Sequence, residues 1–177
     1  MKKFLVIAAL LVFGITAYAQ GKKITSVEGR YSITLPKDFT PLEETTEPVT
    51  TEDSTKLLVH IQSFYDTKGD VLVVSYNDYP DSVFIGQDQN LMLEYARDGA
   101  INNMKSVIEK QSNFKVQKNP AKIVHYTSES DGKPSYNLFQ CVVARPRLYQ
   151  LIFIGLDKKE RETKKIRDLL KSFTLIQ

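Results

Sequence analysis

The segment that decides the fold is residues 148–155, LYQLIFIG, because it is apolar on both of its sides. In an extended strand, alternate side chains point to opposite faces of the sheet. One face of this segment carries Leu148, Ile152 and Ile154, and the other carries Tyr149, Leu151 and Phe153. A strand that is apolar on both faces is typical of a covered sheet, so we expect a layer above this sheet and another below it.

Further strands are expected on either side of this segment in the sequence. Residues 31–35 (YSITL) alternate between apolar and polar side chains, and Pro36 ends the run. The other expected strands are 57–65, 71–77, about 114–118, 121–129 and 135–144. Turns at Lys68-Gly69-Asp70, Asp131-Gly132 and Arg145-Pro146-Arg147 join neighbouring strands tightly, which favours antiparallel pairing. Residues 40–56, rich in Pro, Thr and Glu, and residues 78–87 are expected to be irregular connections.

Two helices are expected between and after these strands. Apolar residues recur at steps of three and four from about residue 89, with Asp88 as the N-cap; they are Met92, Tyr95, Ala96, Gly99, Ala100, Met104, Val107 and Ile108. Glycine costs about 1 kcal/mol in an exposed helix interior, so Gly99 predicts close packing of this helix on a sheet. A second helix begins at Asp157, with Glu160 completing a capping box. Its inner face is Ile166, Leu169, Leu170 and Phe173, and Leu175-Ile176 then add an edge strand.

The resulting order of strands, helix, strands and helix predicts an α+β sandwich. Its central sheet is twisted and mostly antiparallel, and one helix packs on each face. Residues 20–177 contain no internal repeat and no linker, so they are expected to form a single domain.

The first nineteen residues have the features of a secretory signal peptide. Lys2 and Lys3 precede an apolar run over residues 4–13, and Ala17-Tyr18-Ala19 places small residues before a cleavage site between Ala19 and Gln20. The run is shorter than the roughly 20 residues of a transmembrane helix. We therefore expect a bacterial protein that is periplasmic or secreted, with no transmembrane segment in the mature chain. Gln20, rather than a cysteine, follows the cleavage site, so no lipid anchor is expected.

Composition excludes several classes of function. Without the two leader lysines the net charge falls from +3 to +1, which argues against nucleic acid as a partner. The sequence has no glycine-rich phosphate loop and no G-x-S-x-G nucleophile elbow. His60 and His125 stand alone in predicted strands, so a metal site would need the sheet to bring them together. Cys141 lies between apolar neighbours and is expected to be an inert core residue. We therefore expect no catalytic, cofactor-binding or metal-binding residues, and no enzyme activity.

Two groups of residues are candidates for binding a partner. The segment 40–56 carries Glu43, Glu44, Glu47, Glu52 and Asp53, with no basic residue between Lys37 and Lys56. Carboxylates are calcium ligands, but the spacing is not that of an EF-hand, so a solvated segment or a protein-docking loop is the better interpretation. The second group is Tyr79, Arg97, Arg145 and Arg147, because Tyr and Arg are enriched at the centres of interfaces.

Four short segments resemble the PsbP-like superfamily, which includes the PsbP subunit of photosystem II, the Ran-release factors and DcrB-type periplasmic proteins. They are YSITLPKDF, LMLEYARDGAI, RLYQLIFIGLD and DLLKSFTLI. The resemblance implies a three-layer α/β/α sandwich. It also implies a non-enzymatic role in binding proteins or assembling complexes, and it carries no catalytic residues over to this chain.

These observations favour a protein that binds another envelope or secreted protein and needs no cofactor. An alternative stays open. The chain would then be a periplasmic module for a small ligand or a metal ion, with a pocket between the sheet and the segments 40–56 and 78–87.

Overall fold

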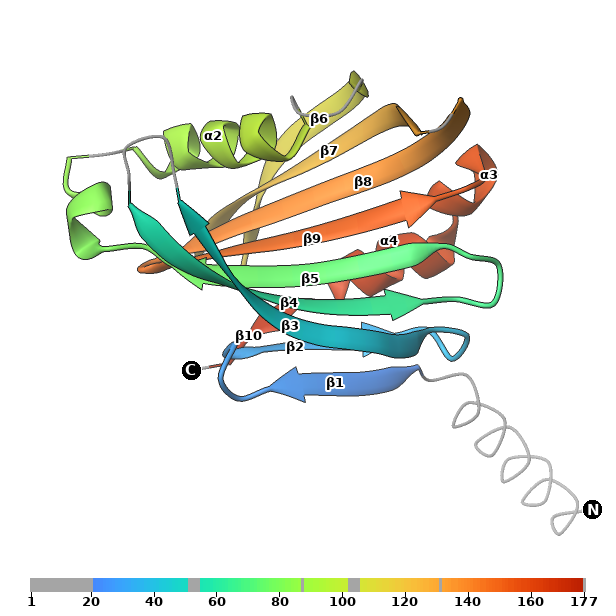
Figure 1. Ribbon diagram of the computed structural model, residues 1–177, viewed down its shortest axis with the longest axis horizontal. Helices are drawn as coiled ribbons and strands as arrows, with labels where there is room; N and C mark the ends of the chain where they lie inside the picture. The colour runs from blue at the N-terminus through green and yellow to red at the C-terminus, as the bar shows by residue number, and fades with distance from the viewer. Residues whose placement is uncertain (1–20, 51–54, 87, 102–105, 131, 177) are drawn as a thin grey trace, which may run out of the picture.

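The main feature of the fold is a twisted antiparallel sheet of seven strands, in the order β3-β4-β5-β9-β8-β7-β6 (Figure 1). The computed structural model describes residues 21–50, 55–86, 88–101, 106–130 and 132–176. The strands are β3 (Thr40–Thr50), β4 (Lys56–Tyr65), β5 (Val71–Asp78), β6 (Ser106–Val116), β7 (Asn119–Ser130), β8 (Lys133–Ala144) and β9 (Arg147–Gly155). Strand β9, formed by the segment that is apolar on both faces, lies in the middle of the sheet between β5 and β8.

A second, smaller sheet joins the two ends of the described chain. It consists of β1 (Lys22–Ser26), β2 (Tyr31–Leu35) and β10 (Thr174–Leu175), with β2 in the centre. The hydroxyl groups of Ser32 and Thr174 lie 2.9 Å apart, across 142 positions of sequence. The predicted strand 31–35 is thus confirmed, but its partners come from both ends of the chain.

One face of the large sheet packs against this small sheet and against helices α3 (Lys158–Arg161) and α4 (Lys164–Lys171). The core here is rich in aromatic rings. Tyr31 of β2 packs on Tyr149 of β9 and on Phe173, with ring centroids 6.2 and 5.5 Å apart. Phe64, Leu151 and Phe153 are fully buried in the same cluster. We call this the aromatic face.

The opposite face is covered by α2 (Gln89–Ile101) and the short 3₁₀ helix η2 (Asp81–Phe84). Helix α2 packs mainly on β7 and β8, and Figure 1 shows it above one end of the sheet. Met92, Leu93 and Ala96 bury its inner side against Phe139 and Val143 of β8, among others. We call this the α2 face. The mostly antiparallel sheet of the expected α+β class is confirmed, whereas the two helix layers of an α/β/α sandwich are not confirmed by the described residues.

The largest departure from the sequence prediction is the segment 40–56. Its first eleven residues form strand β3 rather than a loop, paired with β4 from Thr40 to Thr50. Strand β3 lies at an edge of the sheet, where proline is tolerated because its missing N–H faces away from the neighbour. Pro41 and Pro48 therefore did not break the strand, and the threonines between them have high strand propensity.

The helices also differ from their predicted limits. Asp88 accepts a hydrogen bond from the backbone N–H of Asn90, which confirms the N-cap of α2. The helix ends at Ile101, and Val107 and Ile108 belong to β6, which also absorbs the strand expected at 114–118. Periodicity alone misassigned these two residues because their spacing continues the helical steps, whereas they pair with Thr127 and Tyr126 of β7. Met104 lies outside the described residues.

The C-terminal helix is split into two. Asp157 caps α3 by accepting from Lys159 N, whereas Thr163 starts α4 by accepting from Ile166 N. Glu160 does not complete a capping box, since its carboxylate pairs with two lysines. The four predicted inner residues, Ile166, Leu169, Leu170 and Phe173, are all buried.

Candidate functional site

The α2 face is only partly covered, and its uncovered part is apolar. Helix α2 lies over β7 and β8, leaving the adjoining strands β4, β5 and β9 more open. Their side chains on this face are half-buried; they are Val59, Ile61, Val71, Val73, Ile152 and Ile154. Val73 is central, between Ser63 of β4 and Ile152 of β9. We call these six residues the open strip. Ser63, Ser75 and Gln150 lie among them on the same face. A largely apolar surface of this kind commonly marks an interaction site.

A cavity of about 620 Å³ lies at one end of the open strip. Its floor includes Leu148 and Gln150 of β9, and one wall is formed by Tyr95 and other α2 residues. Thr55 and Tyr79 close the remaining sides. Tyr95 is 64% exposed, so the mouth of the cavity is wide. The cavity lies beside the connection 78–87 and the start of β4, where the sequence placed a ligand pocket.

The glutamates of β3 are divided between the two faces of the sheet. Glu43 pairs with Ser63 and Glu47 with Val59, so both lie on the face that carries the open strip. Glu44 pairs with Gln62 and lies on the aromatic face. All of β3 is exposed except Thr45, which is half-buried. The structure therefore brings Glu43 and Glu47, but not Glu44, to one border of the open strip. Glu52 and Asp53 lie outside the described residues.

Tyr79 and Arg145 lie together at the cavity end of the same face, around Phe84. The rings of Tyr79 and Phe84 meet edge to face with centroids 6.3 Å apart, and the Arg145 guanidinium lies 5.2 Å from the centroid of Phe84. The sequence predicted both residues as partner contacts, and that role stays a prediction.

Arg147 lies on the other side of the sheet and makes several intramolecular contacts. It donates two hydrogen bonds to Asp78, of 2.6 and 2.7 Å, and one of 2.7 Å to the carbonyl of Glu28. Its guanidinium also lies 4.4 Å from the centroid of the Tyr76 ring. The hydrogen bond to Arg147 lowers the pKa of Asp78, and the same bond raises the pKa of Arg147. Its contacts therefore close the end of the aromatic face.

Arg97 lies on α2, where it pairs with Glu94 and donates to Asp98 over 2.7 Å and to Gln111 of β6 over 3.1 Å. Glu94 also forms an ion pair with the buried Lys122, whose Nζ lies 2.8 Å from Glu94 Oε1. These contacts attach α2 to β6 and β7 and lie on the side of the helix away from the open strip.

The two histidines are separated by the order of the strands. His60 is on β4 and His125 on β7, with β5, β9 and β8 between them, so the sheet does not form a histidine pair. His60 stacks on Tyr76 with centroids 4.5 Å apart. His125 lies 3.3 Å from Glu162; burial, with Lys110 nearby, lowers its pKa. Cys141 is fully buried and burial raises its pKa to about 12, which keeps the thiol protonated.

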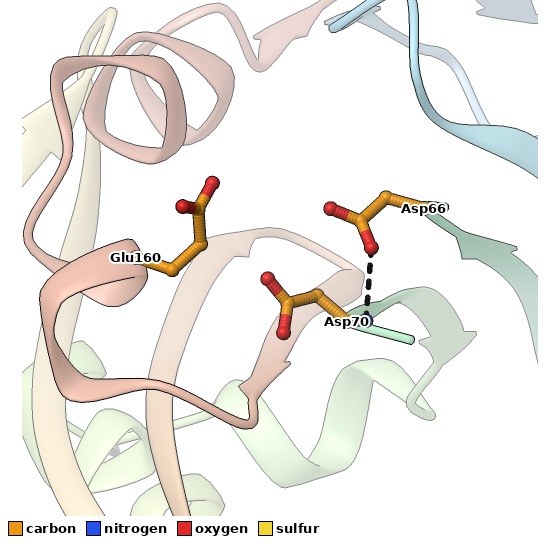
Figure 2. Close-up of side chains that lie close together, drawn as sticks. All are labelled: Asp66, Asp70 and Glu160. Atoms are coloured by element: carbon orange, nitrogen blue, oxygen red, sulfur yellow. Dashed lines mark hydrogen bonds between the residues drawn. The ribbon is translucent and has the colours of Figure 1, made fainter. Parts of the chain in front are cut away.

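Three carboxylates gather where the β4–β5 hairpin meets α3. Asp66 and Asp70 belong to the hairpin and Glu160 to α3, and one oxygen of each lies within 4.8 Å of the others (Figure 2). Asp66 Oδ1 accepts from the backbone N–H groups of Lys68 and Asp70. Among the described residues, these three are close enough together to hold a metal ion. We call them the acidic cluster. The sequence predicted no metal site, because 90 positions separate Asp70 from Glu160.

Two lysines surround the acidic cluster. Lys165 Nζ lies 2.6 Å from Glu160 and 3.0 Å from Asp38, and Lys68 Nζ lies 2.9 Å from Glu160. Burial opposes the charge of Lys165, but its bonds to Glu160 and Asp38 outweigh this and raise its pKa. The same lysines lower the pKa of Glu160. Burial raises the pKa of Asp70, and the neighbouring Asp66 and Glu160 add to that effect.

A second cavity, of about 600 Å³, opens on the aromatic face between α4 and strands β6 to β8. Its apolar floor includes Phe114, Ile123 and Leu138. Basic residues stand around it; they are Lys110, Lys115, Arg167 and Lys171. Glu162 is the acidic residue in its lining.

The predicted cleavage residues Ala19 and Gln20 lie outside the described residues, so the leader stays a prediction. Within the described parts of the chain, no helix combines the length and the apolar character needed to cross a membrane.

Comparison with known proteins identifies the fold. The chain matches no family model and no curated protein sequence. It resembles the solution structure of cyanobacterial PsbP (CyanoP) from Synechocystis sp. PCC 6803, with a TM-score of 0.55, 11% identity, and coverage of 89% of this chain and 93% of that chain. It equally resembles LpqN, involved in cell envelope biogenesis of Mycobacterium tuberculosis, with a TM-score of 0.55, 13% identity, and coverage of 88% and 90%.

A third similar structure is a protein from Bacteroides thetaiotaomicron, with a TM-score of 0.53 and 13% identity over 89% of this chain and 49% of that one. These likenesses define the class: a twisted antiparallel sheet partly covered on both faces. The chain has the PsbP-like fold that its sequence segments resembled. At this level of identity the likeness shows the fold alone, so function is argued from this chain's own surfaces.

Proposed function

We propose that this protein is a non-enzymatic binding protein of the bacterial envelope, which uses the open strip to dock another exported protein. The observation that carries the proposal is the half-buried apolar surface of β4, β5 and β9 beside α2. Leaving such surface in water costs roughly 25 cal/mol per Å², and a partner that covers it recovers that free energy. The predicted leader and the involvement of the similar protein LpqN in cell envelope biogenesis support the compartment.

The chemistry of the surface indicates what kind of segment would dock. The open strip provides aliphatic contacts, and the cavity at its end admits a large side chain. Glu43 and Glu47 border the strip, and β3 contains no basic residue. The partner we propose is therefore a segment of another exported protein with apolar side chains and flanking Lys or Arg residues.

The test uses two positions of one strand that face opposite sides of the sheet. A photo-crosslinking residue replaces Ile61, in the open strip, or Leu58, which is 58% exposed on the other face. Both proteins are irradiated in the native envelope and adducts are identified by mass spectrometry. We expect one dominant protein adduct from position 61 and none from position 58.

Charge reversal then tests the chemistry of the partner. The double substitution Glu43→Lys with Glu47→Lys should reduce the adduct at position 61 several-fold, while Glu44→Lys on the other face serves as the control. Equal adducts from positions 61 and 58, or no adduct from a folded protein, would contradict the proposal.

A second candidate function rests on the cavity beside α4. Its apolar floor and basic surroundings suit a small amphipathic anion, such as a fatty acid. A ligand at 100 times its Kd should stabilise the protein by about 2.7 kcal/mol. Thermal denaturation with laurate, repeated on the variant Lys171→Glu, distinguishes the two functions. The ligand-binding function predicts that laurate stabilises the protein, whereas the docking proposal predicts no response to laurate.

A further inference from the structure

The acidic cluster contains a buried oxygen atom that its surroundings leave without a partner. Asp70 is 2% exposed, and its Oδ1 accepts a hydrogen bond from Leu156 N at 3.0 Å. Its Oδ2 is buried and has no hydrogen-bond partner. Such an atom is costly, and native proteins rarely keep one without a functional reason. Figure 2 shows the three carboxylates of the cluster facing a common space.

The charges around this space do not balance. Four carboxylates meet here, from Asp38, Asp66, Asp70 and Glu160. Two ammonium groups offset them, from Lys68 and Lys165. When all six groups are ionised, two negative charges remain, which is the charge that one divalent cation neutralises.

The ligand type and spacing select among divalent cations. Every side chain of the cluster offers oxygen, which calcium and magnesium prefer, whereas zinc favours nitrogen and sulfur. Calcium accepts flexible cages of protein oxygen atoms at about 2.3–2.6 Å, whereas magnesium demands near-octahedral geometry and usually keeps several waters. Three carboxylate oxygens no more than 4.8 Å apart lie within the reach of one calcium ion.

We propose that Asp66, Asp70 and Glu160 bind one Ca²⁺, which joins the β4–β5 hairpin to α3. Lys68 is 62% exposed and is able to leave Glu160 for solvent. Lys165 Nζ lies 2.6 Å from Glu160 and 3.5 Å from Asp66, so a bound ion must displace this ammonium group toward Asp38. Lys165 stays a competitor for the same carboxylates, so the affinity is modest. We expect a Kd on the order of 0.1–1 mM, the range of extracellular calcium modules.

This site is separate from the proposed docking surface. Val71 of the open strip follows Asp70 in sequence, but its side chain lies on the α2 face, whereas the cluster meets α3 on the aromatic face. The cavity lies at the other end of β4 and β5, near Thr55 and Tyr79. Loss of calcium binding and loss of partner docking are therefore distinguishable by separate variants.

The first experiment is a calcium titration of the protein purified after export. Thermal unfolding is followed as CaCl₂ is added, and we expect the midpoint to rise and then saturate, with a smaller effect of MgCl₂. Tb³⁺ provides a direct readout, because the chain has no tryptophan and Tyr65 directly precedes Asp66. Excitation of tyrosine should produce Tb³⁺ emission that Ca²⁺ abolishes.

The decisive variant is Asp70→Asn, which keeps the shape of the side chain and removes its charge. It should fold, and its affinity for Ca²⁺ should fall more than about tenfold, because one of three carboxylates is lost. Glu129→Gln, an exposed position of β7 outside the cluster, is the matched control and should respond as the unaltered protein does. The proposal is wrong if the folded protein shows no saturable response to Ca²⁺, or if Asp70→Asn retains it.

Discussion

The aromatic face and the α2 face of the same sheet are closed in different ways. On the aromatic face, the small sheet, α4 and a cluster of rings leave Phe64, Leu151 and Phe153 without solvent contact. On the α2 face, one helix buries β7 and β8 but leaves the open strip half-exposed. Because the aromatic face buries the larger cluster, we expect it to supply the larger share of the folding free energy, whereas the α2 face leaves apolar side chains half-buried. Neighbouring residues of β9 test this comparison directly, because they alternate between the two faces.

The largest effect is expected from removing a ring of the aromatic face. Phe153→Ala should lower the free energy of unfolding by about 3–5 kcal/mol, because it opens a cavity in a closed core. Ile152→Ala, one residue earlier on the α2 face, should cost only about 1 kcal/mol, because its side chain is already half-exposed. Urea denaturation measures both values. Equal losses would mean that the two faces are closed to the same degree.

The next largest loss of stability is expected from a substitution of Gly155, at the end of β9. A Cβ atom at Gly155 would lie 2.8 Å from the Phe153 ring and 3.0 Å from the carbonyl oxygen of Tyr136. Gly155→Ala should therefore destabilise the protein by about 1–3 kcal/mol through overpacking. The midpoint of thermal unfolding is the measurement, and an unchanged midpoint would show that the aromatic face has room for a methyl group.

The ion pair between Arg147 and Asp78, at the end of the aromatic face, should make the stability of the protein depend on pH. Arg147 lowers the folded-state pKa of Asp78, so the pair contributes stability above the unfolded pKa near 4. That contribution is lost as the pH falls through the lower, folded-state pKa. Because Asp78 is about half exposed, Asp78→Asn should cost only about 1 kcal/mol at pH 7. The variant should also show a smaller loss of stability between pH 5 and about pH 3. A cost that persists unchanged at low pH would contradict this account.

The smallest effect is expected on α2 and has the opposite sign. The sequence suggested that Gly99 packs tightly against the sheet, but this prediction is wrong: a Cβ atom there would meet nothing within 4 Å, and the residue is exposed. Gly99→Ala should therefore stabilise the protein by about 0.5–1 kcal/mol through helix propensity. Chemical denaturation is the measurement, and a loss of stability would mean that α2 lies closer to the sheet.

The regular parts of the fold were predictable because their signals are local. The apolar faces of 148–155, the hairpin turn at Lys68-Gly69-Asp70 and the inner face Ile166–Phe173 each depend on side-chain period or turn chemistry within one segment. The candidate site was predicted only in part. A cavity lies beside residues 78–87, where a ligand pocket was expected, and Thr55 lines it from the segment 40–56; ligand binding there stays a prediction. The open strip was missed, because the pattern of β4 and β5 does not show how far α2 extends over them.

The sequence by itself thus determined most strands of the large sheet, their antiparallel hairpins and the need for cover on both sides of 148–155. Tertiary structure decided which residues provide that cover. Strand β3 exists because β4 offers it a line of hydrogen bonds, and β10 pairs with β2 only because the chain ends meet. The acidic cluster likewise needs α3 to approach the β4–β5 hairpin. Contacts between distant segments depend on how the segments pack, and no local pattern of residue types records that packing.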